Sequence, residues 1–286
     1  MISCIICSRR PDISAELKEN IASTIGCEYE LIVIDNSKNE YSIFSAYNEG
    51  VRRAKGNVLC FMHEDIIYHT NDWGPKVLDY FKQYPRAGLI GVAGTHYMPA
   101  MPAAQWDSEL SSSSMIQGEV INGHYITTNW EQTDYKSTPT LMVAVDGLWM
   151  CMPEKMFYRV CWDENVYKGF HCYDTDMAFQ TWNAGFEVHL FWDVLIEHQS
   201  IGSANKAFVE ASEALFRKWK HILPMMKGVS LSAREQKLCD SLCECKGICR
   251  ISNMRYKEVI ASHAYRLGKR IIMPFTYLKK RLYYYE

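Results

Sequence analysis

The sequence predicts an α/β fold in which a mostly parallel sheet is flanked by helices and followed by a helical C-terminal extension. Between Ile2 and Gly94, short apolar segments with strand character alternate with amphipathic segments of helical period. This alternation is typical of parallel strands joined by right-handed crossover helices. The chain has 286 residues, of which 48% are hydrophobic, so it is long enough to bury one large core and to carry an appendage.

The N-terminal part contains four expected strands and three expected helices. Patterns of buried strands occur at Ile2–Cys7, Tyr29–Ile34, Val58–Phe61 and Gly88–Gly94. Helical patterns occur at Ile13–Ile25, Ser42–Lys55 and Asp72–Tyr84. Gly26 and Gly56 directly follow the first two helical patterns, and glycine commonly ends a helix. These two glycines therefore mark where the first two helices end.

The pattern changes after Gly94. Residues Thr95–Thr140 are rich in Ser, Pro, Gly and aromatic residues, and we expect long loops there with short strands at Glu119–Ile121 and Tyr125–Asn129. A long irregular stretch in a compact domain is usually functional or mobile. The regular elements expected after it are Leu141–Val145 (strand), Asp174–Asn183 (helix) and Phe186–Phe191 (strand). We expect a first domain over residues 1–203 and a helical, basic extension over residues 204–286.

Composition excludes several classes of protein. The formal net charge of −2 argues against electrostatic binding of nucleic acid. No apolar run approaches the length needed to span a bilayer. Met1–Cys7 has the pattern of a strand and lacks the basic start and long apolar region of a signal peptide. We therefore expect a cytoplasmic location.

Eleven cysteines is a high number, and most of them lie in strand-like segments. In a reducing compartment such residues act as small buried hydrophobes. Four of them form a cluster at Cys239, Cys243, Cys245 and Cys249. This spacing lacks the paired C-x-x-C units typical of structural zinc. The cluster therefore favours ordinary helix packing over a zinc site.

The segment Phe61-Met62-His63-Glu64-Asp65-Ile66 directly follows an apolar strand. In open α/β sheets, ligands bind just beyond the carboxyl ends of the strands. Carboxylate oxygens suit Mg²⁺ or Mn²⁺, and a histidine nitrogen shifts the preference toward Mn²⁺. His63 and Asp65 are therefore candidate ligands of a divalent cation. The alternative interpretation is a solvated acidic turn.

A second group of polar residues, Ser8, Arg9 and Asp35, follows the first two expected strands. An acidic residue at the tip of the second strand is placed to accept hydrogen bonds from a ribose or a base. The first loop contains no glycine, so it lacks the G-x-G-x-x-G pattern of NAD and FAD sites, and no P-loop pattern is present. For Asp35 alone, a turn-forming role is the alternative.

Two further groups carry candidate chemistry. Asp174 and Asp176 lie at an expected helix start, where one of them could be a general base that accepts a proton from an attacking hydroxyl. Helix capping is the alternative role of Asp174. His198 follows a strand and precedes a Gly/Ser loop, where a histidine can close a metal site or contact a phosphate. A purely structural histidine is the alternative.

Taken in order, these segments resemble the family 2-type glycosyltransferases, whose catalytic domain has the GT-A fold. The similarity covers residues 1–203. The matching segments are Ile2 to Ser8, Leu31-Ile32-Val33-Ile34-Asp35-Asn36-Ser37, Ala46-Tyr47-Asn48-Glu49-Gly50, Ala54-Lys55-Gly56 through Phe61 to Asp65, Val145-Asp146-Gly147, Tyr173-Asp174-Thr175-Asp176-Met177, Trp182-Asn183-Ala184-Gly185-Phe186 and His198. Each segment alone is a weak signal, and their order makes the similarity fairly specific.

The resemblance implies a role for each matching residue. It implies a nucleotide site at Ser8, Arg9, Asp35 and Asn48 and a metal site at His63, Asp65 and His198. It implies catalytic carboxylates at Asp174 and Asp176, with Asp174 as the base. The implied acceptor side consists of Asp146, Gly147 and Trp149. The sequence departs from the family pattern twice. His63 replaces the usual first acid of the D-x-D metal motif, and Tyr173 replaces the usual glutamate before the base.

The implied function is transfer of a sugar, with inversion, from a nucleotide-sugar donor to a glycan or lipid-linked acceptor in surface polysaccharide assembly. A UDP-sugar is the expected donor, and Mn²⁺ or Mg²⁺ is the expected cofactor. A non-catalytic nucleotide-sugar or carbohydrate-binding protein on the same fold is the alternative. A nucleotidyltransferase would need a Gly-rich, basic first loop, which this sequence lacks.

The C-terminal segment from Arg255 to Glu286 mixes basic residues with aliphatic and aromatic ones. This combination suits the interface of an anionic membrane, so a peripheral location at the inner membrane face is one expectation. A packed helix with a solvated basic face is the other.

Overall fold

The computed structural model describes residues 1–130, 139–202, 204–263 and 265–267. The chain forms two compact units, Met1–Glu244 and Cys245–Glu286. Most of the basic C-terminal segment, residues 268–286, lies outside the described residues.

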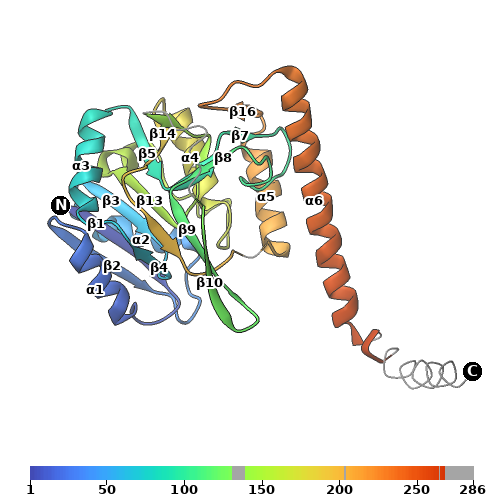
Figure 1. Ribbon diagram of the computed structural model, residues 1–286, viewed down its shortest axis with the longest axis horizontal. Helices are drawn as coiled ribbons and strands as arrows, with labels where there is room; N and C mark the ends of the chain where they lie inside the picture. Colours follow the sequence, from blue (N-terminus) through green and yellow to red (C-terminus); the bar gives the residue numbers. More distant parts are fainter. Residues whose placement is uncertain (131–138, 203, 264, 268–286) are drawn as a thin grey trace, which may run out of the picture. The chain divides into compact units, whose positions relative to one another are not determined.

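A seven-stranded sheet forms the centre of the first unit, in the order β11-β14-β5-β13-β3-β1-β2 (Figure 1). Its strands are β1 (Ile2–Ser8), β2 (Tyr29–Asp35), β3 (Val58–Met62), β5 (Ala87–Gly91), β11 (Thr140–Leu141), β13 (Trp149–Pro153) and β14 (Glu187–Leu190). Strands β1, β2, β3, β5 and β14 run in one direction, whereas β11 and β13 run in the other. The sheet is therefore mostly parallel, as the sequence predicts.

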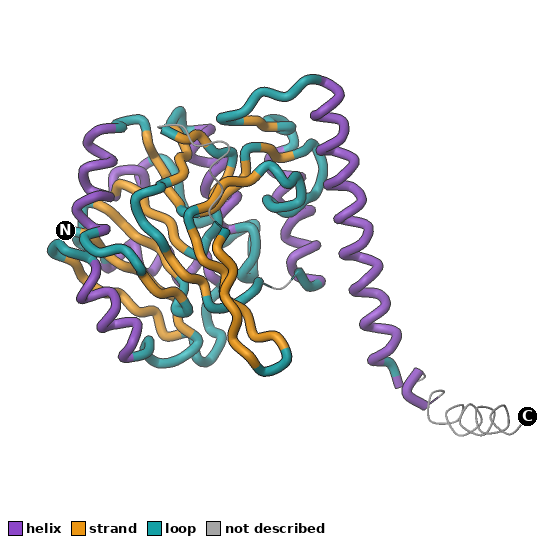
Figure 2. The backbone as a smooth tube through the Cα atoms, in the orientation of Figure 1, coloured by secondary structure: helices purple, strands orange, loops and turns teal. Residues whose placement is uncertain are grey.

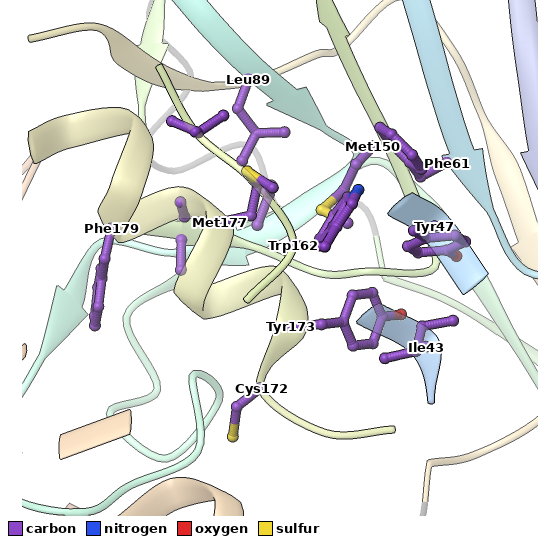
Figure 3. Close-up of a cluster of buried hydrophobic side chains, with 14 of the residues drawn as sticks. Ile43, Tyr47, Phe61, Leu89, Met150, Trp162, Cys172, Tyr173, Met177 and Phe179 are labelled. Carbon is purple, nitrogen blue, oxygen red and sulfur yellow. The ribbon is translucent and has the colours of Figure 1, made fainter. Parts of the chain in front are cut away.

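Helices cover both faces of this sheet, and each face has its own core. The helices of the first unit are α1 (Ala15–Thr24), α2 (Ile43–Arg53), α3 (Trp73–Gln83), α4 (Tyr173–Asn183) and α5 (Lys206–Trp219), with a 3₁₀ turn at Glu154–Tyr158. Successive residues of a strand point to opposite faces. In β1, Ile5 therefore packs in the core with α2 and α4, while Cys4 and Ile6 pack in the core with α1 and α3. Figure 3 shows part of the first core, which surrounds Tyr173.

The predicted helices and the first three strands agree with the structure to within about two residues at each end. The central antiparallel strand β13 is absent from the prediction. Its sequence, Trp-Met-Cys-Met-Pro, has no β-branched residue and no alternation, so it carries no strand signal, although all five residues are buried. The strand expected at Gly88–Gly94 is two strands, β5 and β6 (Ala93–Thr95), and the one expected at Leu141–Val145 is β11 and β12 (Ala144–Val145).

The segment Thr95–Thr140 contains more strand than the sequence predicts. Its strands are β7 (Tyr97–Met98), β8 (Ser111–Ser113), β9 (Met115–Ile121) and β10 (His124–Asn129). Strands β9 and β10 form a hairpin (Figure 2) whose two turn residues, Asn122 and Gly123, both have positive φ. This Asn-Gly pair is the strongest short hairpin signal in a sequence. Within the segment, residues 131–138 lie outside the described part.

Three small sheets complete the first unit. The four-stranded one has the order β10-β9-β15-β4, and the others are β12-β6-β8 and β16-β7. The strands not yet given are β4 (Ile66–Tyr68), β15 (Ile196–His198) and β16 (Met225–Met226). Because β4 follows β3 directly in the chain, the four-stranded sheet begins where a central strand of the main sheet ends.

Helix α5 lies after residue 203, where the sequence analysis placed the end of the first domain. Its buried residues Phe208, Leu215 and Trp219 belong to the core of the main sheet. The compact unit therefore extends beyond the expected boundary, because the apolar face of α5 covers the core next to α4.

The four cysteines of the cluster lie on one helix, α6 (Ala233–Ala261). Cys243 is buried, whereas Cys245 and Cys249 are exposed. Among the residues that the structure describes, the one group with metal-ligand geometry lies elsewhere and contains no cysteine. Within the same residues, no helix is both long enough and apolar enough to cross a membrane.

Candidate metal and catalytic site

His63, Asp65 and His198 come together in the structure, as the sequence analysis expects. His63 Nδ1 lies 3.4 Å from His198 Nε2 and 3.8 Å from Asp65 Oδ1. His198 Nε2 lies 3.6 Å from the same Asp65 oxygen. One ligand atom from each residue therefore lies within 4.8 Å of the other two, which is the separation expected of ligands around one cation.

Strand pairing sets this geometry. His63 and Asp65 belong to the short connection between β3 and β4, and His198 ends β15. In the four-stranded sheet, His198 pairs with Ile66 of β4 on one side and with Gln117 of β9 on the other. The main-chain N–H of Gln199 also donates to the Asp65 carbonyl oxygen at 2.9 Å. The β4–β15 pairing therefore brings together residues that are 133 positions apart (198 − 65).

The charge states of Asp65 and His63 fit a cation site. Burial raises the pKa of Asp65, but contacts with His198 and Ser200 outweigh burial and hold that pKa well below its usual range. Burial and the neighbouring His198 lower the pKa of His63, which favours a neutral imidazole with a free lone pair. Burial lowers the pKa of His198, but its contact with Asp65 and the negative charge of Asp146 outweigh burial and raise that pKa, so a proton competes with a cation for this imidazole. Two imidazole nitrogens and one carboxylate form a mixed nitrogen and oxygen donor set, of a kind that can hold a divalent cation.

Tyr173 contacts this group from the start of α4. Its hydroxyl lies 2.7 Å from His63 Nε2, the ring nitrogen that does not face Asp65. Gly147 makes this position of the phenol possible, since a Cβ at residue 147 would overlap the Tyr173 hydroxyl. The two residues at which the sequence departs from the family pattern, His63 and Tyr173, are therefore hydrogen-bonded to each other.

Asp174, the candidate base, is the next residue of α4. Its Oδ2 accepts hydrogen bonds from the Gly147 main-chain N–H at 3.1 Å and from Gln105 Nε2 at 3.2 Å, and its Oδ1 accepts one from the Thr175 N–H at 2.7 Å. Burial, together with the negative charge of Asp146, raises the pKa of Asp174 to about 7. A carboxyl group with a pKa near neutrality is well matched to accepting a proton under physiological conditions.

Gln105 joins the two carboxylates of the site, and the sequence analysis did not identify it. Its Nε2 lies 3.2 Å from Asp146 Oδ2 and 3.2 Å from Asp174 Oδ2, so one amide group donates to both. Its Oε1 is buried and has no hydrogen-bond partner among the residues that the structure describes. Gln105 lies in the irregular part of Thr95–Thr140, where only the tertiary fold determines which side chains reach the site.

Asp176 has a different environment from Asp174. It is 1% exposed and accepts hydrogen bonds from the Trp219 indole at 2.7 Å and the Tyr167 hydroxyl at 3.0 Å. It also forms an ion pair with Lys218 at 2.8 Å. These contacts hold α5 against α4, so they support a structural carboxylate and argue against the catalytic role predicted for Asp176.

The expected nucleotide residues of the first two strands lie side by side. Ser8 pairs with Asp35 in the β1–β2 register, and Asp35 is exposed at the end of its strand. Glu64, which lies between two of the metal-binding candidates, accepts hydrogen bonds from the Ser8 hydroxyl at 2.5 Å and from the Arg9 main-chain N–H at 3.1 Å. Glu64 therefore fixes the first loop against the metal-binding loop, a contact that sequence spacing does not reveal.

Two other predicted site residues lie in packing positions. The Asn48 amide donates to the Trp162 carbonyl oxygen at 2.9 Å, so Asn48 ties α2 to the loop before α4. Trp149 is fully buried in β13, where its indole N–H donates to the Tyr68 hydroxyl at 3.0 Å and its ring stacks on Phe191. These contacts belong to the core on the other face of the sheet from Tyr173, which argues against an acceptor-side role for Trp149.

Comparison with known protein families shows to which family this chain belongs. The family described as "Glycosyltransferase like family" matches residues 1–214, which is most of the chain. The chain belongs to this family. A comparison with curated protein sequences found no match.

The chain is also similar to solved structures of known proteins. A crystal structure of GalNAc-T7 with UDP, GalNAc and Mn²⁺ has a TM-score of 0.50 and 11% sequence identity, and the similarity covers 91% of this chain and 57% of that one. The crystal structure of S. aureus TarS 1-349 in complex with UDP-GlcNAc has a TM-score of 0.48 and 10% sequence identity, and the similarity covers 87% of this chain and 72% of that one. The present chain thus spans little more than half the length of the GalNAc-T7 chain. The fold is of the GT-A type.

The Gln105 bridge makes a prediction about the Asp174 carboxyl group. Replacing Gln105 by Leu removes the N–H group shared by the two carboxylates while keeping a side chain of similar size. Because a hydrogen bond donated to a carboxylate stabilises its charged form, we expect the pKa of Asp174 to rise above about 7. Titration of ¹³C-labelled aspartate by NMR measures this shift. The exposed Gln83 provides the control substitution Gln83→Leu, and an unchanged pKa in Gln105→Leu would contradict the bridge.

Proposed function

We propose that this chain transfers a sugar, with inversion, from a nucleotide-sugar donor to a hydroxyl group of an acceptor. A UDP-sugar is the proposed donor. The observation that carries the proposal is the geometry at the start of α4, in a chain that belongs to a glycosyltransferase family. There, a His₂Asp group with metal-ligand geometry adjoins a carboxyl group whose pKa is raised to about 7.

The donor side consists of the metal group and the ends of β1 and β2. A divalent cation held by His63, Asp65 and His198 would neutralise the charge that grows on the leaving diphosphate. The GalNAc-T7 structure contains UDP and Mn²⁺, which agrees with this choice of nucleotide and cation. Asp35 is exposed at the end of β2, where its carboxylate can accept hydrogen bonds from the ribose or base.

The acceptor side consists of Asp174 and its neighbours. The acceptor oxygen bonds to the anomeric carbon as the bond from that carbon to the diphosphate breaks, and the hydroxyl proton passes to Asp174. Inversion requires the base and the leaving group on opposite faces of the sugar. Asp146 and Gly147 orient Asp174 through Gln105 and through a main-chain N–H group.

The position of Trp106 supports the proposal that the acceptor is a glycan or is lipid-linked, as surface polysaccharide assembly would require. It directly follows Gln105 in the chain, its side chain is half-exposed, and it stacks on Phe208 with ring centroids 5.7 Å apart. An indole fixed in this way offers an apolar surface for a sugar ring beside the proposed base.

The first test of this function is a screen of nucleotide sugars. The purified chain is incubated with Mn²⁺ and each donor in turn, and release of the nucleoside diphosphate is measured. Release from one donor class identifies the substrate. A chain that binds a nucleotide sugar but releases no diphosphate, with or without glycan acceptors, would be a binding protein instead.

The metal prediction concerns Asp65. Asp65→Ala removes the carboxylate of the His₂Asp group, so we expect turnover to fall by about 10²-fold or more, which corresponds to a few kcal/mol of transition-state stabilisation. Asp79→Ala, at an exposed position of α3, is the matched control and should keep full activity. Full activity of the native chain in excess chelator would contradict the metal role.

The base prediction concerns Asp174 and the pH dependence of turnover. A base works only when deprotonated, so turnover of the native chain should fall as the pH drops through about 7, the pKa of Asp174. Asp174→Asn should lower turnover by about 10²–10⁴-fold while leaving donor affinity nearly unchanged.

Asp176→Asn is the matched control for the base. It leaves buried groups poorly paired, so it should lower the free energy of unfolding by about 1–3 kcal/mol without moving the pH profile. If Asp176→Asn abolishes turnover in a folded protein and Asp174→Asn does not, the assignment of the base is wrong.

We further propose that the second unit binds an anionic membrane surface on the cytoplasmic side. Arg255, Lys257 and Arg266 are exposed there beside exposed apolar residues such as Tyr256 and Val259. Cations next to such residues suit an anionic lipid interface. A lipid-linked acceptor would then be close to the enzyme.

Charge reversal tests the membrane proposal. In the full-length chain, the triple variant Arg255→Glu, Lys257→Glu, Arg266→Glu should no longer sediment with phosphatidylserine vesicles at low salt, because each basic residue near such a surface contributes about 1 kcal/mol. The exposed residues Lys206 and Arg217 of α5, together with Lys220 directly after it, provide a control of equal charge. If both variants and the native chain stay in the supernatant, the membrane role is excluded.

A further inference from the structure

We propose that Tyr173 is a positioning residue that fixes the His63 imidazole so that its Nδ1 faces Asp65 and His198 as a metal ligand. This inference rests on the metal part of the proposed function. It concerns one hydrogen bond, between Tyr173, the first residue of α4, and His63 in the loop between β3 and β4.

The geometry divides the two ring nitrogens of His63 between two tasks. Nε2 is 2.7 Å from the Tyr173 hydroxyl, and Nδ1 is 3.4 Å from His198 Nε2 and 3.8 Å from Asp65 Oδ1. A neutral imidazole binds a metal through the nitrogen that carries no proton. Ligation through Nδ1 therefore requires the proton on Nε2, from which it is donated to the Tyr173 oxygen. The hydrogen bond to Tyr173 thus fixes the ring orientation that ligation needs, and with the Tyr173 oxygen as acceptor it stabilises the required tautomer.

The phenol ring of Tyr173 is itself held on several sides. Its side chain is 6% exposed, and its ring lies 5.8 Å from that of Tyr47 and 6.1 Å from that of Trp162, between centroids (Figure 3). Gly147 closes the remaining side, because any side chain there would displace the Tyr173 hydroxyl. Since the ring cannot move freely, the hydroxyl is a fixed point against which the partly exposed imidazole can align. The His63 side chain is 34% exposed, so packing holds it less firmly than it holds the buried phenol.

The alternative is that Tyr173 only fills the core, with His63 serving as a partner for its buried hydroxyl. The two cases differ in what removal of the hydroxyl changes. A positioning residue alters metal affinity through His63, whereas a packing residue alters stability alone.

The experiment measures Mn²⁺ affinity of the full-length chain by calorimetry or electron paramagnetic resonance, without nucleotide. Tyr173→Phe keeps the ring and removes the hydroxyl, and we expect affinity to fall by about 10–100-fold, the usual effect of losing a group that orients a metal ligand. Tyr167→Phe is the matched control. Tyr167 is similarly buried, and its hydroxyl is also hydrogen-bonded to a polar partner, Asp176 at 3.0 Å, so Tyr167→Phe should lower stability and leave Mn²⁺ affinity unchanged.

A second background tests whether Tyr173 acts through His63. His63→Asp keeps a metal-binding side chain but has no ring nitrogen for the phenol to orient. In that background, Tyr173→Phe should cause no further loss of Mn²⁺ affinity. In the native background, ¹⁵N NMR of the metal-free chain should show the Nε2–H tautomer of His63, and Tyr173→Phe should remove this preference.

Three results would overturn the inference. The first is a folded Tyr173→Phe variant that binds Mn²⁺ as tightly as the native chain. The second is an equal loss of Mn²⁺ affinity on Tyr173→Phe in the native and His63→Asp backgrounds. The third is a His63 tautomer that Tyr173→Phe does not change. If Tyr173→Phe folds poorly, Gly147→Ala displaces the hydroxyl while keeping the phenol, and it should also weaken Mn²⁺ binding. If the native chain binds no Mn²⁺, both the metal site and this inference are wrong. If the native chain and Tyr173→Phe bind Mn²⁺ with equal affinity, only the role of Tyr173 is wrong.

Discussion

The start of α4 is the constraint on which the rest of the site depends. Three residues within one helical turn face three different parts of the protein. Tyr173 contacts His63 in the metal group, Asp174 accepts a hydrogen bond from Gly147, and Asp176 anchors Lys218 and Trp219 of α5. Because these side chains share one rigid helix, the position of the metal loop, the orientation of the proposed base and the packing of α5 are set together.

The pairing of Asp146 with Asp174 shows how the fold keeps two carboxylates close. Like charges at short range disfavour each other, and burial adds to the cost of the charged form. Gln105 places one donor group against both carboxylates, and main-chain N–H groups of Gly147 and Leu148 donate one hydrogen bond to each. The pair is therefore held in place, while the pKa of Asp174 stays raised by burial and by the repulsion from Asp146 that remains. A proton arriving from an acceptor hydroxyl would relieve that repulsion, which suits a general base.

The sequence predicts the parts of this structure that local pattern determines. The strands β1, β2 and β3 and their crossover helices have clear periodicity, and their carboxyl ends carry the polar residues that converge. The sequence analysis does not predict strand β13, because a strand buried on both faces shows no alternation. It does not identify the contacts of Gln105 and Glu64 for another reason. Their partners lie 41 or more positions away in the chain, so no local spacing reveals the contact.

The two departures from the family pattern make sense as one exchange. The resemblance implies an acid at position 63 and a glutamate at position 173, and the structure places these positions in direct contact. Two acids there would add to Asp65, Asp146 and Asp174 and concentrate negative charge around one small region. An imidazole and a phenol in hydrogen-bond contact remove that repulsion and still provide a ligand atom. In the proposed metal site, the exchange replaces a hard oxygen donor with a nitrogen donor. Changing only one of the two positions would leave either an unoriented imidazole or a buried hydroxyl without its partner, so the physical chemistry couples the two residues.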